Sequence, residues 1–280
     1  MNGARGIIGV ITNNRHEVFQ RAIIRGVEEA ALARSYQVVV DSIAEDAAHP
    51  RPVALDLGAM SGILVIANVL PDDQLRELHE AGRPMTLISH HVPGLSIPAV
   101  ITDNRRGMGV LTRAMFEQWG CRRMVYIRGD MQQSDAVERE EAVERELMRA
   151  NLTIDPELVL NGQFEPSLTW RLMAELLARR RDFDGVLAAD YQMALAALRA
   201  LREVGVRVPD EVQVGGFGDG EDAANAGLTT VAADVLEQGR RGARQLIGQM
   251  EGLRMRGTTV LNTALIPRST TRPARAEDAS

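Results

Sequence analysis

The stretch DGVLAADYQMALAALRALREVGVRVPDEVQVGGFGD, residues 184–219, decides the fold. An apolar run from Gly185 to Ala189 is followed by a segment with apolar residues at helical spacing and then by a second apolar run, Val212 to Gly216. A helix between two short apolar strands predicts a crossover connection, so the strands should be parallel. Because open α/β sheets bind ligands at the carboxyl ends of their strands, Asp190 and the loop from Phe217 to Asp219 are the first candidates for a site.

The same alternation extends outward over nearly the whole chain. Further strands are expected at 6–12, 36–40, 62–67, 85–89, 97–102, 124–129, 158–162, 229–232 and 263–266. Amphipathic segments lie between them at 18–33, at 71–82, at 107–120, at 135–149, at 167–180 and at 235–250, with one more that ends at 55–60. The segment 135–149 is so rich in charge that most of it is expected to be solvated surface. The pattern predicts an α/β protein with two doubly wound parallel-sheet lobes.

Composition excludes several classes of function. The formal charge of -6 and the pI near 5.5 argue against a nucleic-acid surface in these residues, because phosphate binding relies on clustered Lys and Arg. A single cysteine, Cys121, excludes an internal disulfide framework. The amino terminus has no cleavage pattern, and no stretch approaches the roughly 20 apolar residues that span a bilayer. We therefore expect a cytoplasmic protein with no membrane contact.

The sequence offers no catalytic constellation. It has no nucleophile paired with a base and no metal-ligand spacing. Its histidines are expected at the surface: His16, His49, His79, His90 and His91. GGFGDG, residues 215–220, ends a late strand, whereas a dinucleotide loop opens a helix after a first strand, so a flexible binding loop is the preferred interpretation. We predict that the protein is not an enzyme and uses no cofactor or metal.

An ordered set of segments resembles a known family. The segments are Gly9–Ala30, SGILVIA at 61–67, RPMTLISH at 83–90, Val100–Gly129, the stretch 183–219, LTTVAAD at 228–234 and IPRSTT at 266–271. Together they are similar to the effector-binding core of LacI/GalR-type transcription regulators, which has the periplasmic binding protein-like fold, type I. The resemblance implies that the chain crosses between the lobes three times, with lobes at 5–103 plus 234–263 and at 104–232 plus 264–273.

This resemblance also implies a function. The expected ligand is a small polar metabolite such as a sugar, bound in a cleft between the lobes and controlling DNA binding allosterically. The chain opens directly on the first core strand, so we expect operator DNA to be bound only through a headpiece absent from this chain. The alternatives are the sensory module of another signalling protein and a free-standing binding protein of the same fold.

Ligand contacts are expected from both lobes. The first lobe offers Asn13, Asn14, Phe19 and His90, and the second offers Asp103, Arg139, Asp190, Phe217 and Asp219. Phe19 could stack on a ligand or belong to the core, and Asp103 could accept ligand hydroxyls or cap the next helix. Arg139 matches the family's cleft arginine, whose donors suit vicinal hydroxyls or a carboxylate, although a solvated helix charge is the alternative.

Four polar positions of the family pattern have changed here. They are Ala189, Gly218, Ala233 and the pair Ser89–His90. Each change removes a directed hydrogen bond, so the second lobe should offer fewer polar contacts and the ligand should be smaller or less hydroxylated than a hexose. The resemblance further implies a homodimer built on the helices at 19–33 and 72–80, whose outer faces are expected to carry Ile24, Ala31 and Leu75.

Overall fold

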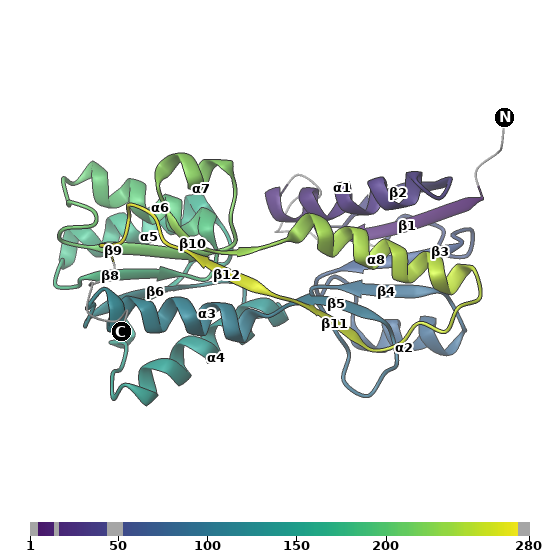
Figure 1. Ribbon diagram of the computed structural model, residues 1–280, viewed down its shortest axis with the longest axis horizontal. Helices are drawn as coiled ribbons and strands as arrows, with labels where there is room; N and C mark the ends of the chain where they lie inside the picture. The colour runs from purple at the N-terminus through teal and green to yellow at the C-terminus, as the bar shows by residue number, and fades with distance from the viewer. Residues whose placement is uncertain (1–4, 14–16, 44–52, 274–280) are drawn as a thin grey trace. The chain divides into compact units, whose positions relative to one another are not determined.

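A computed structural model describes residues 5–13, 17–43 and 53–273 of the chain (Figure 1). The candidates Asn14, His16 and His49 lie outside these ranges. The described residues form two compact units. Unit 1 comprises the residues up to Thr102 together with Asp234–Leu261, and unit 2 comprises Asp103–Ala233 together with the residues from Asn262 onward. The chain therefore passes between the units three times.

Unit 1 is built on a six-stranded sheet in which every pairing is parallel. Its strands are β1 (Gly6–Thr12), β2 (Tyr36–Ser42), β3 (Gly62–Ile66), β4 (Met85–Ile88), β5 (Ala99–Thr102) and β11 (Thr258–Leu261), in the order β11-β5-β4-β3-β1-β2. Helices α1 (Val18–Leu32) and α8 (Val235–Met250) cover one face and α2 (Asp72–Glu80) covers the other (Figure 1).

The two faces of this sheet carry separate apolar cores. Leu64 and Ile66 pack with residues of α1 and α8, whereas Ile63 and Val65 pack with Leu75 of α2. Successive strand residues point to opposite faces, so a strand covered on both sides must be apolar throughout, as GILVI is.

Two expectations about unit 1 are wrong. Ile24, Ala31 and Leu75 are not on outer faces; they are at most 7% exposed, because the apolar stripes of α1 and α2 face the sheet that these helices cover. In addition, the expected amphipathic segment ending at 55–60 is not helical over its described part, residues 53–60.

Unit 2 repeats the architecture. Its strands are β6 (Met124–Arg128), β7 (Val159–Asn161), β8 (Gly185–Ala188), β9 (Gln213–Phe217), β10 (Thr229–Ala233) and β12 (Thr263–Ile266), in the order β12-β10-β9-β8-β6-β7. Only the β10–β12 pairing is antiparallel, so the expected parallel sheet is parallel except at this edge.

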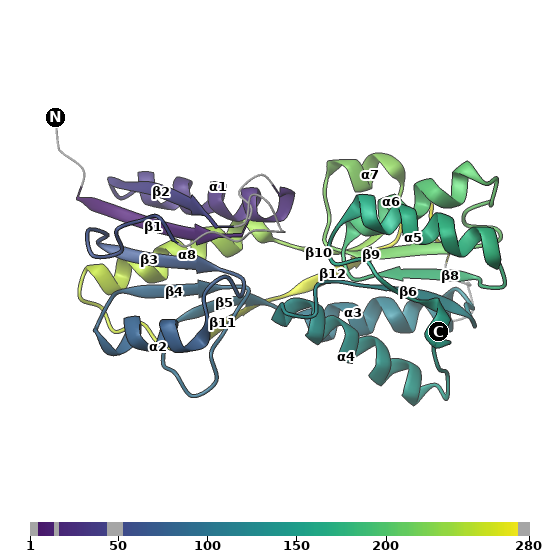
Figure 2. The ribbon, with the colours of Figure 1, turned by 180° about the vertical axis from the view of Figure 1, so that it is seen from behind.

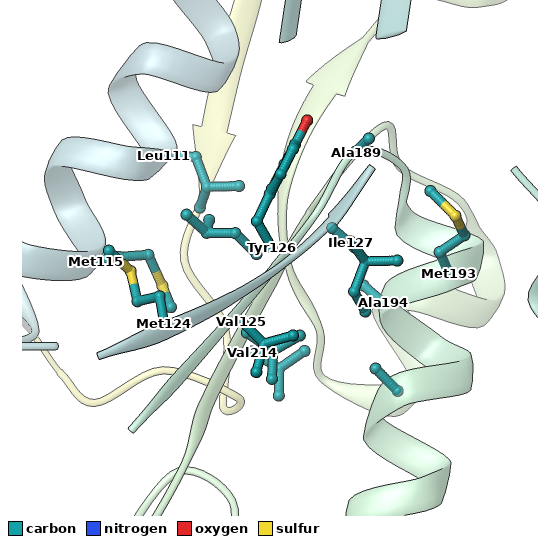
Figure 3. Close-up of a cluster of buried hydrophobic side chains, with 14 of the residues drawn as sticks. Leu111, Met115, Met124, Val125, Tyr126, Ile127, Ala189, Met193, Ala194 and Val214 are labelled. Carbon is teal, nitrogen blue, oxygen red and sulfur yellow. The ribbon is translucent and has the colours of Figure 1, made fainter. Parts of the chain in front are cut away.

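Helices cover both faces of this second sheet (Figure 2). They are α3 (Asn104–Arg113), continued by a π-helical turn (Ala114–Gln118), α4 (Ser134–Arg149), α5 (Pro166–Arg179), α6 (Tyr191–Glu203) and α7 (Glu221–Ala226), with a 3₁₀ turn at Pro156–Leu158. Along β6, Met124 lies beside Met115 and Tyr126 lies toward Leu111, whereas Ile127 points to the other face, toward Met193 and Ala194 (Figure 3). The strand β11 and the helix α7 were not anticipated from the sequence.

The strand order determines where each unit can bind a ligand. In both sheets the order reverses beside the first strand of the unit, between β1 and β3 and between β6 and β8. The carboxyl ends of strands at such a reversal form the usual ligand site of open α/β sheets. In unit 2 those ends lead into Gly129 and Ala189.

Candidate functional site

Arg139, near the middle of α4, is the central residue at the carboxyl ends of the unit 2 strands. It is 6% exposed, so the alternative of a solvated helix charge is wrong. Its Nε donates to Asn104 Oδ1 at 2.9 Å, its Nη1 donates to the carbonyl of Ala189 at 3.0 Å, and its Nη2 reaches Asp135 Oδ2 at 3.4 Å. A guanidinium has five N–H groups. The three acceptors fix the orientation of the group and leave two N–H groups available to a ligand.

A buried polar network between α3 and α4 holds Arg139 in place. Asn104, 1% exposed, donates through Nδ2 to Asp135 Oδ1 and Glu138 Oε2, both at 2.8 Å. The exposed Arg105 extends this network by forming ion pairs with Glu138 and with Glu141. Charged residues on this inner side of α4 are 9% exposed or less, so the prediction that most of the helix is solvated surface is wrong.

Two aromatic rings flank the guanidinium. The ring centroid of Phe217, at the end of β9, lies 4.0 Å from the Arg139 guanidinium carbon, and that of Phe164, after β7, lies 6.0 Å away. Sequence reasoning found Phe217 but missed Phe164. Gln163 and Phe164 both have positive φ, a conformation that side chains rarely adopt and that is often found at functional sites. A Cβ at Gly129 would lie 2.2 Å from the Phe164 ring, so this glycine makes room for it.

Asp103 and Asp190 serve as helix caps. Asp103 Oδ1 accepts the amide hydrogen of Arg106 at 3.1 Å, and Asp190 Oδ1 accepts that of Met193 at 2.7 Å. Asp103 thus takes the capping role that the sequence left open. The neighbouring Asn104, rather than Asp103, contacts Arg139.

Asp219 is engaged within unit 2. Its carboxylate receives two hydrogen bonds from Arg268, at 2.8 and 2.9 Å, and one from Thr230 Oγ1 at 3.0 Å. Burial raises the pKa of Asp219, but the bonds from Arg268 and Thr230 outweigh it and lower that pKa. The preceding Gly218 has φ +87°, and a Cβ there would lie 3.0 Å from the Tyr191 ring, which favours glycine over the family's aspartate.

The described candidates of unit 1 each have different neighbours. His90 follows β4 and is 4% exposed, so its expected place at the surface is wrong. Its Nδ1 lies 3.0 Å from Asn68 Nδ2 and its Nε2 lies 3.1 Å from Asp72 Oδ1. Phe19 packs partly buried against the core beneath α1, and the carbonyl of Asn13 accepts a bond from Ser42 Oγ at 2.8 Å.

Neither a metal site nor a membrane span is found among the described residues. Within the ranges given above, no group of three or more His, Cys, Asp or Glu side chains could hold a metal ion. No helix in that part of the chain is long and apolar enough to cross a bilayer.

Comparison with known proteins supports the two-lobed α/β fold. Residues 114–271 match the family described as periplasmic binding protein-like domain. The transcriptional regulator CelR of Thermobifida fusca is 33% identical over 241 residues, which cover 84% of this chain and 71% of that protein. The repressor CytR of Escherichia coli K12 is 27% identical, over 97% of this chain and 80% of that protein.

Comparison with solved structures supports the same fold. A CelR–cellobiose complex has a TM-score of 0.79 at 28% identity, over 96% of this chain and 85% of that one. A lac repressor dimer bound to operator has a TM-score of 0.81 at 21% identity, over 95% and 93%, and supports the fold alone.

The fold and the family match define a protein of the periplasmic binding protein-like class. The chain belongs to the LacI family of transcriptional regulators and corresponds to their effector-binding core. The resemblance and the fold class inferred from the sequence are thereby confirmed.

Proposed function

We propose that the protein senses a sugar or another small hydroxylated metabolite at the carboxyl ends of the unit 2 strands, with Arg139 as the anchor. The supporting observation is the fixed guanidinium: three acceptors and the face of Phe217 hold it while two N–H groups remain available. A donor that is already oriented loses little conformational entropy when a ligand binds.

The flanking rings suggest what kind of ligand fits. The partly buried Phe164 offers an apolar ring next to a cation, whereas Phe217 is 3% exposed and stacks on the guanidinium. A ring beside a cation suits a molecule with C–H groups on one side and hydroxyls at its edge. The changed positions reduce the polar donors: Ala189 provides only its carbonyl, which Arg139 already uses, and Gly218 provides no side chain. A ligand smaller or less hydroxylated than a hexose is therefore part of the proposal.

The test begins with a thermal-shift screen of cellobiose, single hexoses and smaller polyols. A ligand present at 100 times its Kd adds about 2.7 kcal/mol to the free energy of unfolding, which is measurable for a chain of this size. The best compound is then titrated by calorimetry against the wild type and Arg139→Gln. Loss of the anchor should weaken binding by roughly ten- to hundredfold, because about 1.5–3 kcal/mol of charge-assisted hydrogen bonding disappears.

The matched control is Arg149→Gln, which removes the same charge from the exposed end of the same helix. This variant should bind as the wild type does. Circular dichroism of Arg139→Gln checks that the fold is kept, and Phe164→Leu provides a second variant that leaves the α3–α4 network intact. Unchanged affinity in both Arg139→Gln and Phe164→Leu would show that the site lies elsewhere.

We also propose that the ligand acts on transcription and that the chain is a cytoplasmic homodimer. Operator binding would require a DNA-binding segment in addition to these 280 residues, whose formal charge is -6. Because Ile24, Ala31 and Leu75 are buried, the exposed apolar residues Leu32 and Val39 replace them as the expected dimer contacts in unit 1. Sedimentation equilibrium at micromolar concentration should give a dimer, and Leu32→Glu with Val39→Glu should give a monomer.

A further inference from the structure

An open surface cavity of about 620 Å³ lies in unit 1, and none of the candidate ligand-binding residues lines it. Its walls come from the end of α2, from the residues just before β4 and β5, and from the turn after α8. The residues that matter for its chemistry are His79, Arg83, Ser96, Gln249, Arg254 and Arg256. Its volume is in the range of cavities that hold small organic molecules.

This cavity lies apart from His90, the candidate ligand-binding residue that follows β4. Pro84 and Pro98 line it and directly precede β4 and β5, so it lies at the amino ends of these strands. His90 follows β4 at the opposite, carboxyl end. A strand of this length spans about 13 Å, which separates the two edges of the sheet.

The cavity is strongly cationic. Arg83, Arg254 and Arg256 contribute three permanent positive charges. Arg254 and Arg256 are exposed and make no ion pair or hydrogen bond with the described residues. The acidic side chain in the same turn, Glu251, is already paired with Arg5 at 3.3 Å and with Arg34 at 3.4 Å.

Arginines near the end of a helix often serve to satisfy its last carbonyls, but here the backbone does so. After α2, the amides of Gly82 and Arg83 donate to the carbonyls of His79 and Leu78, at 2.9 and 3.2 Å. After α8, the amides of Gly252 and Leu253 donate to Gln249 and Gly248, at 3.0 and 2.8 Å. Both turns have the Schellman pattern with a glycine of positive φ, so the arginine side chains are not needed as caps.

We propose that this cavity binds a small organic molecule through a compact oxyanion of at least two negative charges. Guanidinium forks match the geometry of phosphate and carboxylate oxygens, and the Ser96 hydroxyl adds a neutral donor. Leu253 and Met255 provide an apolar wall for the carbon part of the ligand. The site is independent of the effector site proposed above.

Calorimetry with pyrophosphate and with citrate, at matched ionic strength, tests the proposal. At least one of them should bind the full chain with a Kd below about 1 mM. Tighter binding of pyrophosphate would identify phosphate as the oxyanion, and tighter binding of citrate a polycarboxylate. The double variant Arg254→Gln with Arg256→Gln should weaken binding by at least about tenfold, since each lost arginine removes a charge-assisted hydrogen bond.

The matched control is Arg171→Gln with Arg202→Gln, which removes two exposed arginines from unit 2. It should leave the Kd within about twofold, because neither arginine lines the cavity. No binding of either anion at 10 mM would overturn the proposal. Equal weakening in both double variants would also overturn it, because that result indicates a general effect of net charge.

Discussion

Units 1 and 2 arrange their first five strands in the same order, yet they hold the helix pairs on their sheets by different means. In unit 1, α1 and α8 meet backbone to backbone: a Cβ at Gly26 would lie 2.1 Å from the carbonyl oxygen of Leu236, and one at Gly239 would lie 2.0 Å from that of Ile23. In unit 2, α3 and α4 meet through side chains, with Asn104 at one end and the Arg113–Glu146 pair at the other. The stability of unit 1 should therefore be sensitive to added side-chain volume, because its two helices pack closely. The stability of unit 2 should be sensitive to pH, because its two helices meet through charged side chains.

The largest expected effect is the slow labelling of a cysteine that reports on unit 2 alone. Cys121, the single cysteine, lies in unit 2, and burial raises the pKa of its thiol to about 12, with Asp184 acting in the same direction. A neutral, buried thiol reacts slowly, because the thiolate is the nucleophile. Iodoacetamide labelling at pH 8 should be at least about a thousandfold slower than in urea-unfolded protein, as expected when opening costs about 5 kcal/mol or more. Labelling at the unfolded rate would mean that unit 2 is not the compact body described.

The second effect concerns the glycine contact of unit 1. Gly239→Ala places a methyl group against a backbone carbonyl, so α1 and α8 must separate, and we expect a loss of about 2–3 kcal/mol in the free energy of unfolding. Urea denaturation followed by circular dichroism measures it. The control is Gly248→Ala in the same helix, where the added Cβ meets the flexible side chain of Met255 at 3.3 Å. It should stay within about 1 kcal/mol of the wild type, and equal losses in the two variants would contradict the distinction.

The smallest effect concerns the ionic contact of unit 2. Glu146 is 2% exposed and pairs with Arg113 at 2.9 Å, with Arg145 at 3.3 Å and with Arg149 at 3.1 Å. Burial raises the pKa of Glu146, but these arginines outweigh burial and lower it below its usual value of 4.5. A lowered folded pKa gives stability that is present above pH 4.5 and lost as pH falls through the folded pKa.

Glu146→Gln should therefore cost about 1–2 kcal/mol at pH 7, and the difference from the wild type should be smaller at pH 3, which is below the usual carboxyl pKa of 4.5. Urea denaturation at the two pH values measures it. Glu144→Gln, at an exposed position of the same helix, should stay within about 0.5 kcal/mol at both. A difference that persists unchanged at pH 3 would show that Glu146 acts by packing rather than by charge.

Much of the fold followed from local patterns. The two strands of the βαβ unit at 184–219 were predicted to within one residue at each end, because an apolar run is a local pattern. The helix α7 and the strand β11 were missed, since both are short and carry few apolar residues, and β11 is a strand only because it pairs with β5. Ile24 and Ala31 were assigned to the wrong face because helical spacing shows that a stripe exists but not which neighbour covers it.

Some features of the candidate site also followed from the sequence, and others only from the tertiary structure. The sequence by itself determined the family, the alternation of strands and helices, and the choice of Arg139 and Phe217, because each depends on residue type and order along the chain. Only the tertiary structure decided that Asn104 rather than Asp103 contacts Arg139, that Phe164 flanks it, and that Asp219 is held by Arg268. These contacts join residues that are 35, 25 and 49 positions apart, and no local pattern specifies which side chains meet when separate strands end at the same edge of a sheet.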